Sequence, residues 1–111
     1  MAVVSCPVSM LRGVPVIRAP GEIDVASAEP LRAVLAETAA RGHATIVVDL
    51  SATRFCDSAG LNALVSAARQ ARAEGGEVRL VVTSEAVSRI VELTGVDRVI
   101  PVYASLEDAV S

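Results

Sequence analysis

The feature that most constrains the fold of this chain is residues 45–50, Thr-Ile-Val-Val-Asp-Leu, an almost unbroken apolar and β-branched run. A strand with one solvent-exposed face alternates polar and apolar residues, whereas a strand covered on both faces does not. Residues 45–50 are therefore predicted to form a central strand. Residues 78–82 show the same character and are predicted to form a further buried strand.

Apolar residues elsewhere recur every three or four positions, which is the spacing of one helix face. Ser is a favoured N-cap and Gly a common stop, so these residues set the predicted boundaries. The predicted helices extend from Ser27 to Gly42, from Asp57 to Gly75, from Ser84 to Gly95 and from Ser105 to about Val110. Pro30 is expected in the first turn of the first helix, where a proline is tolerated.

The chain is predicted to open with an antiparallel hairpin of residues 3–10 and 14–19 around an Arg12-Gly13 turn, and residues 99–103 to form a last strand. This order of elements predicts an α/β fold with a mixed, mostly parallel sheet packed with about four α-helices. A chain of 111 residues has little room for a second core, so residues 1–111 are predicted to be one domain.

Composition excludes several classes of function. The net charge is -3, and no run of arginines could follow a phosphate backbone, so we expect no nucleic-acid partner. All ten basic residues are arginine, which excludes a lysine Schiff base or a P-loop lysine. No group of residues has metal-ligand spacing, and no glycine-rich loop has phosphate-binding spacing, so we expect no metal and no cofactor.

The cysteines and the apolar segments bear on the compartment. Cys6 and Cys56 are far apart in sequence and match neither a redox pair nor a zinc ligand set. A reducing compartment is therefore favoured. No segment resembles a leader or approaches the roughly 18 apolar residues of a membrane span, so we expect a cytoplasmic protein with no membrane partner.

The sharpest local feature is Asp57-Ser58-Ala59-Gly60, at the junction of a buried strand and an amphipathic helix. Amides at a helix start have no intrahelical partner, and the helix dipole favours negative charge there. A phosphate on Ser58 would therefore be tolerated, and Gly60 would let another chain approach closely. The plainer interpretation is that Asp57 or Ser58 only caps the helix.

Three blocks of the chain, in order, carry a family resemblance. They are Gly-Glu-Ile-Asp at 21–24, Asp-Ser-Ala-Gly-Leu at 57–61, and Leu-Thr-Gly-Val-Asp-Arg-Val-Ile-Pro-Val-Tyr at 93–103. Together they resemble the STAS family of anti-sigma-factor antagonists, and the resemblance spans nearly the whole chain. It implies a single STAS domain over residues 1–111.

The resemblance also implies a mechanism. The unphosphorylated antagonist binds an anti-sigma factor, itself a serine kinase using MgATP, and so frees a sigma factor. Phosphorylation ends the binding, and a serine phosphatase restores it. The family's phosphoacceptor falls on Ser58, and Ala59 removes the second hydroxyl that many members carry. The implied partner-binding residues are Asp24, Asp57, Ser58, Ala59, Gly60, Leu61 and Asn62.

Other functions stay open at this point. A STAS domain that is not phosphorylated could be an interaction subunit of a lipid-transport or stress-signalling complex. A receiver domain would need an acidic pair and a lysine that this chain lacks. An enzyme is not predicted, because Ser58 has no visible base and the only histidine, His43, is expected at the opposite end of the sheet. Cys56 is expected to be a buried, inert thiol.

Overall fold

The computed structural model describes residues 6–111, and a five-stranded sheet lies at its centre. The strand order is β1-β2-β4-β6-β7. The strands are β1 (Val8–Leu11), β2 (Val14–Arg18), β4 (Thr45–Asp49), β6 (Glu77–Val81) and β7 (Val102–Tyr103). β1 and β2 are antiparallel, whereas β2, β4, β6 and β7 pair in parallel. The predicted mixed, mostly parallel sheet is confirmed.

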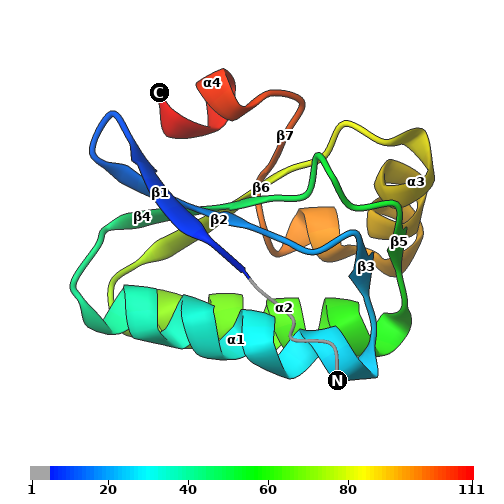
Figure 1. The fold of residues 1–111 in the computed structure, drawn as a ribbon, viewed down its shortest axis with the longest axis horizontal. Helices are drawn as coiled ribbons and strands as arrows, with labels where there is room; N and C mark the ends of the chain where they lie inside the picture. The colour runs from blue at the N-terminus through cyan, green and yellow to red at the C-terminus, as the bar shows by residue number, and fades with distance from the viewer. Residues whose placement is uncertain (1–5) are drawn as a thin grey trace.

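Helices cover both faces of this sheet (Figure 1). α1 (Val25–Ala40) and α2 (Ser58–Ala73) lie side by side on one face. α4 (Leu106–Val110) covers part of the other face, and α3 (Glu85–Thr94) lies beyond one end of the sheet. A short 3-10 helix, η1 (Val96–Arg98), connects α3 to β7. The α/β fold with four α-helices is as predicted from the sequence.

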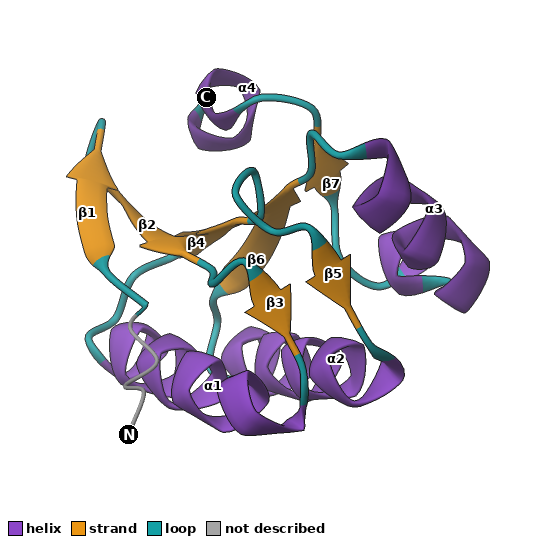
Figure 2. Ribbon diagram, turned by 45° about the vertical axis from the view of Figure 1, so that its right-hand side comes forward, coloured by secondary structure: helices purple, strands orange, loops and turns teal. Residues whose placement is uncertain are grey.

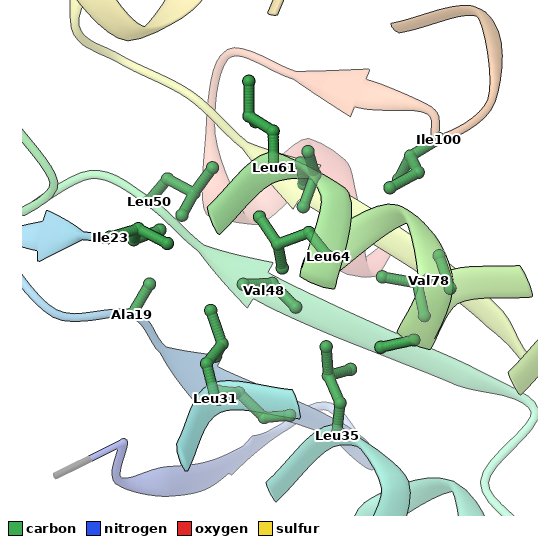
Figure 3. Packing of buried hydrophobic residues seen from close by; sticks show 14 of the residues in the cluster. Ala19, Ile23, Leu31, Leu35, Val48, Leu50, Leu61, Leu64, Val78 and Ile100 are labelled. Atoms are coloured by element: carbon green, nitrogen blue, oxygen red, sulfur yellow. The ribbon is translucent and has the colours of Figure 1, made fainter. Parts of the chain in front are cut away.

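The alternation of side chains along β4 explains its continuous apolar run. Val48 belongs to the main core under α1 and α2, whereas Val47 belongs to a smaller cluster under α4. In the main core, Leu35 of α1 and Leu64 of α2 approach Val48 (Figure 3), and each is at most 1% exposed. Both faces of the strand are therefore buried, as the sequence pattern indicates.

A second sheet, which the sequence did not predict, consists of only two short strands. β3 (Glu22–Ile23) and β5 (Phe55–Cys56) pair in parallel. β3 leads into α1 and β5 leads into α2, so this small sheet lies at the amino ends of both helices (Figure 2).

One predicted helix boundary is wrong. α1 begins at Val25 and its N-cap is Asp24, whereas Ser27 was expected to be the cap. The Asp24 carboxylate accepts a hydrogen bond from the Ser27 amide. The Ser27 hydroxyl accepts one from the Asp24 amide in return, which completes a capping box. Pro30 consequently lies inside the helix and not in its first turn.

The strand boundaries differ in smaller ways. The two hairpin residues Arg12 and Gly13 both have positive φ, 53° and 78°, as a two-residue type I′ turn requires. β1 begins at Val8, and residues 3–5 of the predicted strand lie outside the described residues. The predicted strand 99–103 is shortened to Val102–Tyr103 because η1 occupies the preceding segment.

Within residues 6–111, no helix has both the length and the apolar character needed to cross a membrane. The same residues contain no group of three or more His, Cys, Asp or Glu side chains arranged to hold a metal ion.

Candidate functional site

The small sheet brings two aspartates together. Its register pairs Ile23 with Cys56, and the Asp57 amide donates to the Ile23 carbonyl at 3.0 Å. The residues that follow this pair, Asp24 and Asp57, are therefore neighbours, and each is the N-cap of its helix. Two segments that are 33 positions apart thus place two helix starts side by side (Figure 2).

Both carboxylates are directed to the amides of their own helices. Asp24 Oδ1 accepts from the amides of Ala26 at 3.0 Å and Ser27 at 3.1 Å. Asp57 Oδ1 accepts from the amide of Gly60 at 2.8 Å. The plainer interpretation of Asp57, a helix cap, is therefore correct. It does not compete with a binding role, because a capping carboxylate at a helix start also lies at the surface.

Ser58 is the first residue of α2, and its side chain is exposed. Amides of the first helical turn have no intrahelical acceptor, and the amino end of a helix carries partial positive charge. Because the starts of α1 and α2 adjoin, Ser58 lies in the combined field of two helix dipoles. The arrangement can accommodate a negative group on Ser58 without disturbing the interior.

The structure changes the expected role of Gly60. A Cβ atom at this position would lie 2.4 Å from Ile23 Cγ2 and 2.8 Å from the Ile23 carbonyl oxygen. The close approach that glycine permits is therefore made by the chain's own β3, and not by another chain as expected from the sequence. Gly60 holds the small sheet against the start of α2.

The predicted site residues divide between surface and interior. Asn62 is exposed like Ser58, and Ala59 is half-buried. Gly60 and Leu61 are buried, and Leu61 belongs to the main core. The last two can position the others, but their side chains do not form the outer surface.

Two apolar residues that the sequence analysis missed lie next to the predicted site. Val25, directly after Asp24, is 75% exposed, and Phe55 of β5 is 50% exposed. Residues alternate across a strand, so Phe55 faces solvent because Cys56 faces the core. The available signal was weak: Phe55 is the only phenylalanine of the chain and stands two positions before Asp57.

The sequence profile of the STAS domain matches residues 8–109. This chain belongs to the STAS domain family. The match covers every helix and strand described above except the last residue of α4.

The similar proteins include well-defined STAS regulators. The anti-sigma-B factor antagonist of Bacillus subtilis (strain 168) is 34% identical over 90 residues, which cover 81% of this chain and 82% of that protein. An anti-sigma factor antagonist from Mycobacterium paratuberculosis has a crystal structure with a TM-score of 0.85 at 33% identity, covering 96% of this chain and 90% of that one.

SpoIIAA, another anti-sigma factor antagonist, is similar in two forms. Its unphosphorylated structure has a TM-score of 0.77 at 25% identity and covers 96% of this chain and 93% of that one. The phosphorylated Bacillus form has a TM-score of 0.69 at 25% identity and covers 96% of each chain. These relatives are regulatory binding proteins, and the likeness confirms the STAS fold.

His43 and Cys56 are the other groups of this STAS domain that could take part in chemistry. His43 lies two positions before the start of β4, whereas Ser58 lies in the segment that follows the carboxyl end of β4. The structure thus does not bring them together. Cys56 is 2% exposed, and burial raises the pKa of its thiol to about 11, with the Asp57 carboxylate acting in the same direction.

The Cys56 thiol should therefore be unreactive in the folded protein. The thiolate is the nucleophile, and a pKa two units higher leaves about one-hundredth as much of it, so alkylation by iodoacetamide near pH 8 should be about 100-fold slower than in urea. Peptide mass mapping measures both rates, and equal rates would contradict the prediction. The raised pKa also contributes stability below about pH 9, which is lost as the pH rises towards 11.

Proposed function

We propose that this STAS domain, residues 1–111, is an anti-sigma-factor antagonist. It binds a kinase-type anti-sigma factor, which then releases its sigma factor. The anti-sigma factor uses MgATP to phosphorylate Ser58, and the phosphate ends the binding. A serine phosphatase acting on phosphorylated Ser58 restores it. The proposed partner surface is made by Asp24, Asp57, Ser58, Ala59 and Asn62, positioned by the buried Gly60 and Leu61.

The observation that carries this proposal is the exposed Ser58 hydroxyl at the paired helix starts. Ser27 occupies the first turn of the neighbouring helix, but it is only 4% exposed, and its hydroxyl lies 2.8 Å from the Glu22 carbonyl oxygen. A kinase can reach Ser58 without unfolding the chain, whereas Ser27 is held within it. The two helix starts therefore offer one accessible acceptor.

The electrostatics of the site explain how a phosphate could act as a switch. A phosphate would add a charge of roughly -1.5 to -2 at Ser58. The partial positive charge at the helix start would favour it within the domain. A docked partner would have to desolvate this charge next to Asp24 and Asp57, which costs several kcal/mol when like charges meet. Binding would be lost while the fold is kept.

The relatives support the same function. Three of the similar proteins are anti-sigma factor antagonists by name, and one of them has been solved both with and without its phosphate. The proposal extends their role to this chain through the geometry of Ser58.

The test uses purified kinase-type anti-sigma factors and MgATP. We expect the parent protein to gain one phosphate by intact mass, mapped to Ser58, and Ser58→Ala to gain none. Ser58→Asp should bind the anti-sigma factor at least about 100-fold more weakly than the unphosphorylated parent does, a loss of about 3 kcal/mol in binding free energy. The matched control is Ser66→Asp, which adds the same charge at another exposed serine of α2.

Two results would contradict the proposal. One is a Ser58→Asp variant that binds as tightly as the parent and the Ser66→Asp control. The other is the absence of phosphate on Ser58 with every kinase tested. Either would favour a STAS interaction subunit, of a lipid-transport or stress-signalling complex, that phosphorylation does not control.

A further inference from the structure

The exposed charge of α2 has the opposite sign to that of the whole chain. The chain has a net charge of -3, yet residues 58–73 contain two arginines, Arg69 and Arg72, and no acidic residue. Both arginines are exposed. Arg98 of η1 is also exposed and lines the same hollow as these two. The side of the molecule between α2 and η1 is therefore a local basic surface on an acidic protein.

Two adjoining hollows lie along this side. The smaller, about 200 Å³, is lined by Ser58 and Asn62 at the start of α2. The larger, about 550 Å³, is lined by Arg72 and Arg98. Arg69 and Val99 line both, so the two hollows adjoin at these residues and together extend along α2 from Ser58 to Arg72. We call this the α2 groove.

The dimensions of the α2 groove fit an extended chain segment. Arg72 lies fourteen positions after Ser58 on α2, which is about 21 Å at 1.5 Å per residue. An extended segment rises about 3.3 Å per residue, so six or seven residues would span the groove. A compact anion would occupy only one end of it.

The lining of the groove suits an acidic segment. Three arginines, Arg69, Arg72 and Arg98, and two acidic residues, Glu77 and Asp97, line the larger hollow. One of these carboxylates, on Glu77, lies 3.4 Å from Arg79, which leaves an excess of positive charge. Val78, Val99 and Ile100 also line this hollow and give it an apolar part that a bound chain can contact.

We propose that the partner interface extends from Ser58 along the α2 groove and that Arg69, Arg72 and Arg98 bind an acidic segment of the anti-sigma factor. This inference rests on the proposed function, because the groove begins at the proposed phosphorylation site. The arginines would speed association and select for partners with a complementary surface. A phosphate on Ser58 would then repel the same acidic segment at the other end of the groove.

The first experiment measures binding of the anti-sigma factor to Arg69→Glu/Arg98→Glu and to a control with the same change in charge. The control is Arg32→Glu/Arg41→Glu, because Arg32 lies on α1, Arg41 is the residue that caps its carboxyl end, and neither lines either hollow. We expect the groove variant to bind about tenfold or more weakly, mainly through slower association, and to lose the salt dependence of the parent. Equal weakening of the control would overturn the inference.

The Ser58→Asp variant separates the two proposals. If Ser58→Asp loses binding while the groove variant binds like the parent, the inference fails and the proposed function stands. If Ser58→Asp binds normally but the groove variant does not, the proposed switch fails and the groove remains a docking surface.

A second experiment needs no anti-sigma factor. A heptapeptide of alternating glutamate and alanine is titrated into the isotopically labelled protein, with inorganic phosphate as a separate probe. We expect the peptide to shift the NMR signals of residues at both ends of the α2 groove, and Arg69→Glu/Arg98→Glu to abolish these shifts. Absence of shifts, or equal shifts with phosphate alone, would overturn the inference of an extended acidic occupant.

Discussion

Replacing Gly60 with alanine is expected to lower the free energy of unfolding by about 3 kcal/mol, a large effect for one methyl group. The new Cβ would lie 2.4 Å from Ile23 Cγ2 and 2.8 Å from the Ile23 carbonyl oxygen. The side chain could rotate, but the carbonyl is fixed because it accepts the Asp57 amide at 3.0 Å. β3 must therefore move away from α2, which disturbs the pairing that places Asp57 next to Asp24.

Urea unfolding of Gly60→Ala and Gly21→Ala measures this cost. A Cβ at Gly21 would meet the Ala52 carbonyl oxygen at 3.7 Å, an ordinary contact. The control should therefore change stability by less than about 1 kcal/mol, since the alanine also restricts the unfolded chain. Equal unfolding midpoints for the two variants would show that the contact between Gly60 and Ile23 is not tightly packed.

Replacing Leu64 with alanine is expected to cost about 3–4 kcal/mol of stability. Leu64 is 1% exposed and lies on α2 between Val48 of the central strand and Leu61 (Figure 3). Truncation removes its transfer free energy and leaves a cavity that the surrounding strands and helices cannot close. A chain of this length has a total stability of about 5–15 kcal/mol, so the loss is a substantial fraction.

The same substitution at Leu93 is the matched control. Leu93 is 80% exposed on α3, so Leu93→Ala removes little buried surface and should change stability by less than about 0.5 kcal/mol. Thermal and urea unfolding of both variants measure the difference. A loss at Leu93 comparable with that at Leu64 would mean that Leu93 is covered in solution, for example by a second molecule.

Much of the fold could be predicted because its signals are local. Residues 45–50 read as a strand buried on both faces, and β4 is one. The caps at Asp57, Ser84 and Ser105 were expected from residue type and spacing, and each side chain accepts a first-turn amide. In these cases one stretch of sequence contains both the signal and the interaction that it predicts.

The small sheet could not be predicted in this way. β3 and β5 have two residues each, too few to show a period of two, and each is stabilised by a partner that is distant in sequence. Ser27 is a favoured cap type and would place Pro30 in the first turn, but Asp24 is an equally favoured type. Only the reciprocal hydrogen bonds of the capping box decide between them.

The sequence predicts where the candidate site residues lie along the chain but not what surrounds them in space. Asp57 and Ser58 form a local motif, so their position at a helix start was predictable. The role of Gly60 depends on Ile23, and the exposure of Phe55 depends on which face of β5 meets the core. These features arise from tertiary contacts, which give no signal in the local sequence.

The adjoining starts of α1 and α2 have a consequence for how this domain can diverge. The positive field at Ser58 comes from peptide groups, so it persists whatever surface side chains surround it. Under the proposed function, preference for one partner over another would depend instead on exposed side chains such as Phe55 and Arg98, which can change without loss of the fold. Under the proposed function, duplicated copies of the gene would therefore keep one phosphorylation chemistry while acquiring separate partners, which would insulate their signals from one another.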